Sequence, residues 1–117
     1  VISFGACVPW ALATLEKHPE IKADVIDLRS LQPLDTETIF NSVKKTGKCI
    51  ILQEDTLFGG IASDISALLM ENCFEFLDAP VKRVASIETP IPFVKAIEDQ
   101  YLPKVRFEEE LLALMAY

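Results

Sequence analysis

The fold is decided by the stretch from Val25 to Asp55, VIDLRSLQPLDTETIFNSVKKTGKCIILQED. Its first residues, centred on Val25–Leu28, are a short strand candidate. A helix with two marked ends follows, because Asp35 is a good N-cap and Gly47 can adopt the left-handed conformation that ends helices. The apolar run Cys49–Gln53 is typical of a strand buried on both faces of a parallel sheet. This order predicts a right-handed strand–helix–strand crossover.

The same alternation continues on both sides of this stretch. Val1–Phe4 and Val81–Ser86 are further strand candidates, whereas the proline-punctuated segment after Ser86 cannot form a regular central strand. Apolar residues at steps of three and four predict helices after Pro9, after Gly60 and at the end of the chain. The side chains expected inside are Val8, Leu12, Leu15, Ile39, Phe40, Val43, Ile61, Ala62, Ile65, Leu68, Leu69, Cys73, Phe76, Leu77, Phe107, Leu111, Leu114 and Met115, together with Trp10 and Phe74. We predict an α/β domain with a mainly parallel sheet.

Length and charge narrow the possible partners. The 117 residues are expected to form one domain, residues 1–117. The net charge of −7 disfavours nucleic acid, and no apolar run approaches the roughly 18 residues that cross a membrane. The opening residues VISFGACVPW contain no initiator Met, no basic leader and no cleavage pattern, so we expect a fragment of a larger polypeptide.

The three cysteines, Cys7, Cys49 and Cys73, are far apart in the sequence. Their spacing fits neither a disulfide framework nor a zinc site, and we expect buried, reduced thiols in a cytoplasmic protein. The alternative is a nucleophilic cysteine paired with His18, the single histidine of the chain.

The stretch LQEDTLFGGIASDI, Leu52–Ile65, is the strongest candidate for a site. Free N–H groups after Gly59 and Gly60, at the start of the next helix, could bind an anion. The acids Glu54 and Asp55 precede them, however, and no Lys or Arg occurs between Lys48 and Lys82. A tight turn that packs the helix on the sheet is the favoured interpretation. Leu57 and Phe58 belong either to a partner contact or to local packing. The nucleotide-binding patterns GxGxxG and GxxxxGK[ST] and the nucleophile pattern GxSxG are absent.

The stretch quoted first resembles the carboxy-terminal domain of the transketolase family, whose members share a strand, a DLR-T/S-L-x-P-x-D segment, a helix, K-T-G-K/R and a strand. The continuation GGIASDISALLMENCFEFLDAPVKRVASIETPIPF is similar to the beta chain of the 2-oxo acid dehydrogenases, branched-chain type. The resemblance implies three α/β/α layers with spatial strand order 2-1-3-4. Family members usually carry one more strand, an antiparallel edge strand just upstream of VISFG, which is missing from this sequence. Glu88 departs from the family pattern, which more often has Asp.

The resemblance also implies a function for the parent enzyme and a role for this domain. The parent would decarboxylate a 2-oxo acid and transfer the acyl group to lipoamide. It would bind thiamine diphosphate and Mg in its other domains, so this domain is expected to hold no catalytic, cofactor or metal residue and to be inactive alone. Its expected partners are the other domains, a second subunit in a dimer or heterotetramer, and the lipoamide acyltransferase core, whose docking segment is basic. The interface and active-site rim candidates are Glu54, Asp55, Leu57, Phe58, Gly59, Gly60 and Glu88, with Glu54–Phe58 expected to be a loop.

Several alternatives stay open from the sequence. Within the superfamily they are transketolase, deoxyxylulose-phosphate synthase and the acetoin dehydrogenase relatives, although ETPIPF and APVKRV favour the 2-oxo acid dehydrogenases. From other classes, a free-standing anion-binding regulatory module and a purely structural dimerisation domain remain.

Overall fold

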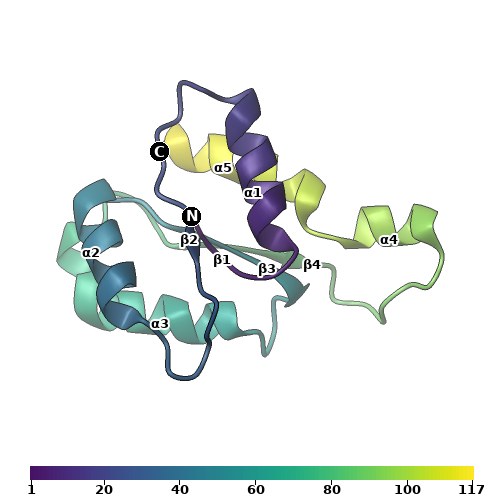
Figure 1. Ribbon diagram of the computed structural model, residues 1–117, viewed down its shortest axis with the longest axis horizontal. Coiled ribbons are helices and arrows are strands. Elements are labelled where there is room, and N and C mark those ends of the chain that lie inside the picture. The colour runs from purple at the N-terminus through teal and green to yellow at the C-terminus, as the bar shows by residue number, and fades with distance from the viewer.

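The computed structural model describes all residues, 1–117, and contains one four-stranded parallel sheet (Figure 1). The strands lie in the order β2-β1-β3-β4, which confirms the expected 2-1-3-4 arrangement. Every neighbouring pair is parallel. The elements are β1 (Ile2–Ser3), α1 (Cys7–Lys17), β2 (Ile26–Asp27), α2 (Thr36–Thr46), β3 (Ile50–Thr56), α3 (Ile61–Cys73), the 3-10 turn η1 (Phe74–Phe76), β4 (Lys82–Ser86), α4 (Lys95–Tyr101) and α5 (Lys104–Met115).

Helices cover both faces of the sheet, which confirms the three-layer α/β/α architecture (Figure 1). One core contains Ile51 of β3 and Cys49, which directly precedes this strand, with side chains from α2 and α3. The other contains Ile50 and Leu52 with side chains from α1 and α5, among them the fully buried Phe107. Because successive strand residues point to opposite faces, β3 contributes side chains to both cores.

The ends of α2 are the ones that the sequence predicts. The side chain of Asp35 accepts a hydrogen bond from the backbone N–H of Thr38 at 3.0 Å, as an N-cap does. Gly47 ends the helix with φ of 71°, and its N–H donates to the carbonyl of Val43.

Four expected core positions are wrong. In α1 the buried stripe is Cys7, Ala11 and Thr14, so Leu12 lies on the exposed side. At the other end of the chain, Met115 is exposed. Phe74 is 67% exposed, and Phe76 is also exposed.

The two phenylalanines fall outside the core because α3 ends at Cys73. A 3-10 turn follows it, with three residues per turn rather than 3.6, and the change of pitch moves both rings off the buried stripe of α3.

The strand β3 extends further than the apolar run. It continues through Glu54, Asp55 and Thr56, so the expectation that Glu54–Phe58 forms a loop is wrong for its first three residues. Pairing with β4 explains the extension, because Thr56 is still aligned with Ser86. None of the helices combines the length and the apolar character that crossing a membrane would need.

Candidate interface site

The candidate rim residues gather where β3 and β4 end. The pairing changes here: three β3 residues, Gln53 to Asp55, lie opposite the single residue Ala85 of β4. Such an irregularity bends a strand and turns its side chains outward. Glu54 and Asp55 are both exposed as a result. We call the residues 54–60 together with Glu88 the rim.

The side chain of Gln53 packs under the glycine turn and forms hydrogen bonds to the backbone on both sides of it. This side chain is completely buried; Nε2 donates to the carbonyl of Thr56 at 2.6 Å, and Oε1 accepts from the N–H of Ala62 at 2.8 Å. A Cβ on Gly60 would overlap Nε2 of Gln53, so glycine is required there by the close approach of the amide. Gly59 instead has a φ of 76°. The glycine pair is therefore a packed turn that joins β3 to α3.

Two backbone donors at the start of α3 are already used. The N–H of Ala62 is bonded to Gln53, and the N–H of Ser63 donates to the carbonyl of Gly60 at 3.0 Å. Anion sites at helix starts depend on free N–H groups. The geometry therefore gives an anion or a diphosphate little to bind at this turn.

A hydrogen bond across the rim brings two of its candidate residues together. Oε1 of Glu88 accepts from the N–H of Phe58 at 2.7 Å, which ties the segment after β4 to the turn after β3. Next to it, the hydroxyl of Ser86 donates to the carbonyl of Glu54. Asp55 binds the N–H of its own neighbour Thr56 at 2.7 Å. The ring of Phe58 is left 88% exposed on a backbone that is held in place.

Two arginines beside the rim have their guanidinium groups engaged by this chain. Arg83 donates to the hydroxyl of Ser63 at 2.7 Å. Arg106 donates to the carbonyls of Ala85, Tyr101 and Gln100 at 2.8, 2.9 and 3.2 Å. Both line a hollow of about 330 Å³ that also contains Glu88, Glu109 and Glu110. The hollow thus carries more acids than free cations.

Burial dominates the surroundings of the three cysteines. All three are buried, and burial raises the pKa of Cys7 to about 12 and that of Cys49 to about 11. A protonated thiol is a poor nucleophile. The expectation of buried thiols is confirmed.

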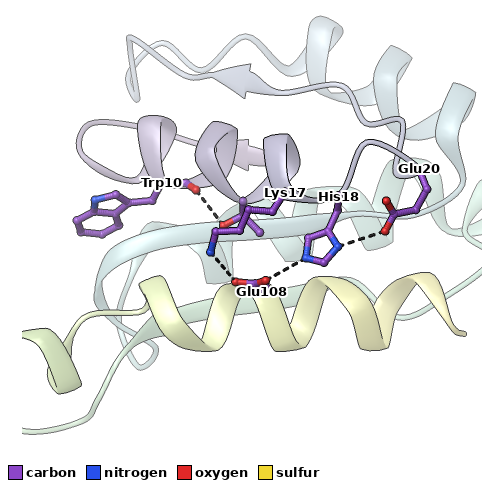
Figure 2. A network of polar contacts seen from close by, with 6 residues as sticks. Trp10, Lys17, His18, Glu20 and Glu108 are labelled. Atoms are coloured by element: carbon purple, nitrogen blue, oxygen red, sulfur yellow. Dashed lines mark hydrogen bonds and ion pairs between the residues drawn. The ribbon is translucent and has the colours of Figure 1, made fainter.

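His18 is bound to carboxylates (Figure 2). Its Nδ1 lies 3.2 Å from Glu20 and its Nε2 3.0 Å from Glu108, whose second oxygen is 3.0 Å from Nζ of Lys17. Since carboxylates only accept, both ring nitrogens donate when the ring is protonated. The bond to Glu108 accordingly raises the pKa of His18. The network joins the end of α1 to α5 and leaves His18 engaged as an ion-pair partner, which contradicts the alternative of a Cys–His nucleophile.

Thiamine diphosphate and its Mg would need a carboxylate or amide set for the metal and free donors for the diphosphate. No group of three or more His, Cys, Asp or Glu residues is placed to hold a metal ion. Two of the helix-start donors after the glycine pair, the N–H groups of Ala62 and Ser63, are taken by Gln53 and Gly60. The residues of this chain do not fit that cofactor.

Three side chains that organise this region were missed from the sequence: Gln53, Arg83 and Arg106. Only Gln53 carried a signal, because strand alternation puts it on the same face as Cys49 and Ile51, where a polar side chain needs buried partners. The arginines gave none, since their partners are backbone carbonyls and a hydroxyl distant in sequence.

Comparisons with known proteins agree on one family. The family model described as "Transketolase, C-terminal domain" matches residues 1–106. The chain is 49% identical over 83 residues to the acetoin:2,6-dichlorophenolindophenol oxidoreductase subunit beta of Bacillus subtilis, covering 71% of this chain and 24% of the relative. It is 39% identical over 105 residues to the pyruvate dehydrogenase E1 component subunit beta of Rickettsia bellii, covering 88% and 32%.

Two further likenesses extend this result. The 2-oxoisovalerate dehydrogenase subunit beta of Bacillus subtilis is 40% identical over 105 residues, covering 87% of this chain and 32% of the relative. A solved structure described as "Split gene transketolase, inactive beta4 tetramer" superposes with a TM-score of 0.74 at 26% identity, covering 97% of this chain and 37% of that one. The chain therefore spans a third or less of the curated relatives named here.

Proposed function

The chain belongs to the transketolase C-terminal domain family, and from that premise we propose that it is the third domain of a thiamine-dependent 2-oxo acid dehydrogenase, decarboxylating component. The parent enzyme decarboxylates a 2-oxo acid and transfers the acyl group to lipoamide. The relatives that support this are beta subunits that act on pyruvate, 2-oxoisovalerate or acetoin by name. The split transketolase has the same fold at lower identity. It supports membership of the superfamily, but it gives less support to the dehydrogenase branch.

Within that enzyme, the domain serves assembly rather than chemistry. The observation that carries this proposal is the tied rim: Glu88 holds the backbone of Phe58, while the ring stays 88% exposed. An aromatic ring on a fixed backbone suits a protein contact, because little conformational freedom is lost on binding. No catalytic, cofactor or metal role is assigned to Glu54, Asp55, Leu57, Gly59 or Gly60; the first four form the rest of the contact surface, and the buried Gly60 supports them from below.

We assign thiamine diphosphate and Mg to the other domains of the parent. The same proposal places the enzyme in the cytoplasm as a dimer or heterotetramer that docks on a lipoamide acyltransferase core. The net charge of −7 supports a basic docking segment on that core, since opposite charges speed association and exclude wrong partners.

Activity of the parent polypeptide is the direct test. The full-length protein with its alpha partner is expected to release carbon dioxide from pyruvate or 2-oxoisovalerate only when thiamine diphosphate and Mg are both present. The isolated 117-residue chain is expected to bind neither thiamine diphosphate nor inorganic phosphate in a titration calorimeter. Binding of thiamine diphosphate by the isolated chain would refute the division of labour, and phosphate protection of residues 54–64 would favour the regulatory module.

The contact itself is tested by a matched pair of surface changes. Phe58→Ser in the full-length protein is expected to shift sedimentation toward smaller species, whereas Phe74→Ser, at the opposite end of the strands, leaves it unchanged. Equal behaviour of the two variants would remove Phe58 from the interface.

A further inference from the structure

The segment from Ile87 to Gln100 leaves the body of the domain and returns to it. It follows β4, passes through ETPIPF and contains most of α4. Figure 1 shows α4 standing apart from the three layers, joined to them by an irregular loop on one side and by the start of α5 on the other. Every residue of this segment except Pro92 is exposed. We call residues 87–100 the arm.

The arm presents large apolar side chains to solvent. Phe93 is fully exposed, and Ile91, Val94 and Ile97 are 65%, 60% and 55% exposed. These four lie within seven consecutive residues, so they form a cluster rather than scattered single positions. A cluster of this kind marks a protein contact in a folded chain.

The base of the arm is firmly fixed. The N–H of Ile87 donates to the carbonyl of Tyr101 at 3.2 Å, which closes the segment like a loop. Arg106 crosses the same base and binds the carbonyls of Ala85, Gln100 and Tyr101. The Tyr101 side chain and Pro103 are buried in the body. The arm therefore leaves the body at a position that the domain itself determines.

Beyond its base, the arm lacks the packing that stabilises helices. α4 has seven residues, and isolated helices shorter than about 12 residues are marginal in water. Pro90 and Pro92 restrict the backbone before it, so that less conformational entropy is lost when the arm is covered. A fixed base, a restricted backbone and an apolar tip are the properties of a preorganised docking element.

The arm is continuous with the rim. Glu88, at its start, is the residue that accepts from the N–H of Phe58. The rim and the start of the arm are therefore neighbouring surfaces of the domain.

We propose that the arm docks on the preceding part of the same polypeptide, in an apolar hollow with Lys or Arg residues at its edge. This rests on the proposed function, because it takes the chain as one domain of a longer enzyme, and more than two thirds of each relative lies outside the match. A tethered surface also has the advantage of high effective concentration. The arm carries Glu88, Glu98 and Asp99 against the single Lys95. A second acidic copy of this domain would repel it, whereas a basic edge would attract it.

Site-specific photo-crosslinking in the full-length polypeptide tests the proposal. A benzophenone amino acid replaces Phe93, and the matched control replaces Phe74, an exposed phenylalanine at the other end of the sheet. Expected is a crosslink from position 93 to peptides that precede this domain in the same chain, at least tenfold above the control. A crosslink to this domain of a second copy, a crosslink to the acyltransferase, or a yield equal to the control would each overturn it.

A second measurement covers the arm as a whole. In the full-length protein, Phe93→Ser is expected to accelerate amide exchange across residues 93–100 at least tenfold, with no change from Phe74→Ser; no acceleration would overturn the proposal. Neither readout depends on turnover. A crosslink to the preceding peptides in a protein that releases no carbon dioxide from 2-oxo acids would refute the proposed function and leave the docking proposal intact. Release of carbon dioxide without that crosslink would refute the docking proposal and leave the proposed function intact.

Discussion

Replacing Gly60 with alanine separates close packing from backbone conformation at the rim. Gly60 has φ of −80° and ψ of 155°, which any residue can adopt, so the backbone does not require glycine. The obstacle is the added Cβ, which would overlap Nε2 of Gln53 and lie 2.7 Å from the carbonyl oxygen of Thr56. The substitution must therefore displace a completely buried amide.

The expected loss of stability follows from what Gln53 does. Displacing it breaks its hydrogen bonds to the Thr56 carbonyl and the Ala62 N–H, each contributing about 1 kcal/mol. Crowding of a packed site adds about 1–2 kcal/mol. We expect Gly60→Ala to lower the free energy of unfolding by about 3–4 kcal/mol in total. Urea unfolding followed by circular dichroism should show this as a lower midpoint at an unchanged slope.

Gly59→Ala is the matched control. Its Cβ would meet no atom within 4 Å, but its φ of 76° is strained for alanine, which costs about 1–2 kcal/mol. In a double-mutant cycle, Gln53→Ala should cost at least about 1 kcal/mol less in the Gly60→Ala background than in the wild type. The reasoning is refuted if Gly60→Ala is no worse than Gly59→Ala, or if the effects at residues 53 and 60 simply add.

Substitutions in three other parts of the structure supply further tests. The bond to Glu108 raises the pKa of His18, so His18 stabilises the fold fully below its ordinary value of 6.5 and loses this as the pH rises through the raised value. In the His18→Ala variant, the melting temperature should therefore depend less on pH between 6.5 and the raised pKa of His18. The pKa of Glu108 is lowered by His18 and, to a smaller extent, by Lys17, so Glu108 stabilises the fold above its ordinary pKa of about 4.5. Glu108→Gln should therefore remove the loss of stability that occurs as the pH falls below that value. A pH profile of stability that is unchanged in either variant would contradict the corresponding prediction. Arg106→Ala should destabilise by about 2 kcal/mol and speed amide exchange near Tyr101, whereas exchange at wild-type rates would show that the arm is held otherwise. Asp35→Ala should cost about 1 kcal/mol in urea unfolding, and Asp35→Ser much less if capping is its role.

The architecture could be predicted from the sequence because its signals are local. Asp35 and Gly47 mark the ends of α2 within a few residues of chain, and the apolar run Cys49–Gln53 marks a central strand. One error occurred where a distant partner decides, because β3 continues through Thr56 by pairing with β4. Another has a local cause, since Phe74 leaves the core where the helix changes pitch after Cys73.

The candidate site was only partly predictable for the same reason. The sequence indicated the glycine pair and the neighbouring acids, and it favoured a packed turn. It carried no signal that Glu88 binds the backbone of Phe58, 30 residues away in the chain. Nor could it place the arm, since the position of α4 depends on Arg106 and three carbonyls at its base.

The contrast between the turn and its surroundings supports the assembly role proposed for this domain. A strand, a glycine pair and a helix start are the parts of many anion sites, but such a site works only if its N–H groups remain free. Here Gln53 fills that place with the amide of the protein itself. The turn becomes rigid by this means, and the groups fixed around it, the exposed ring of Phe58 and the base of the arm, can be presented to a partner in one geometry. The occupied N–H of Ala62 and the fixed geometry of the turn are thus two consequences of one buried glutamine.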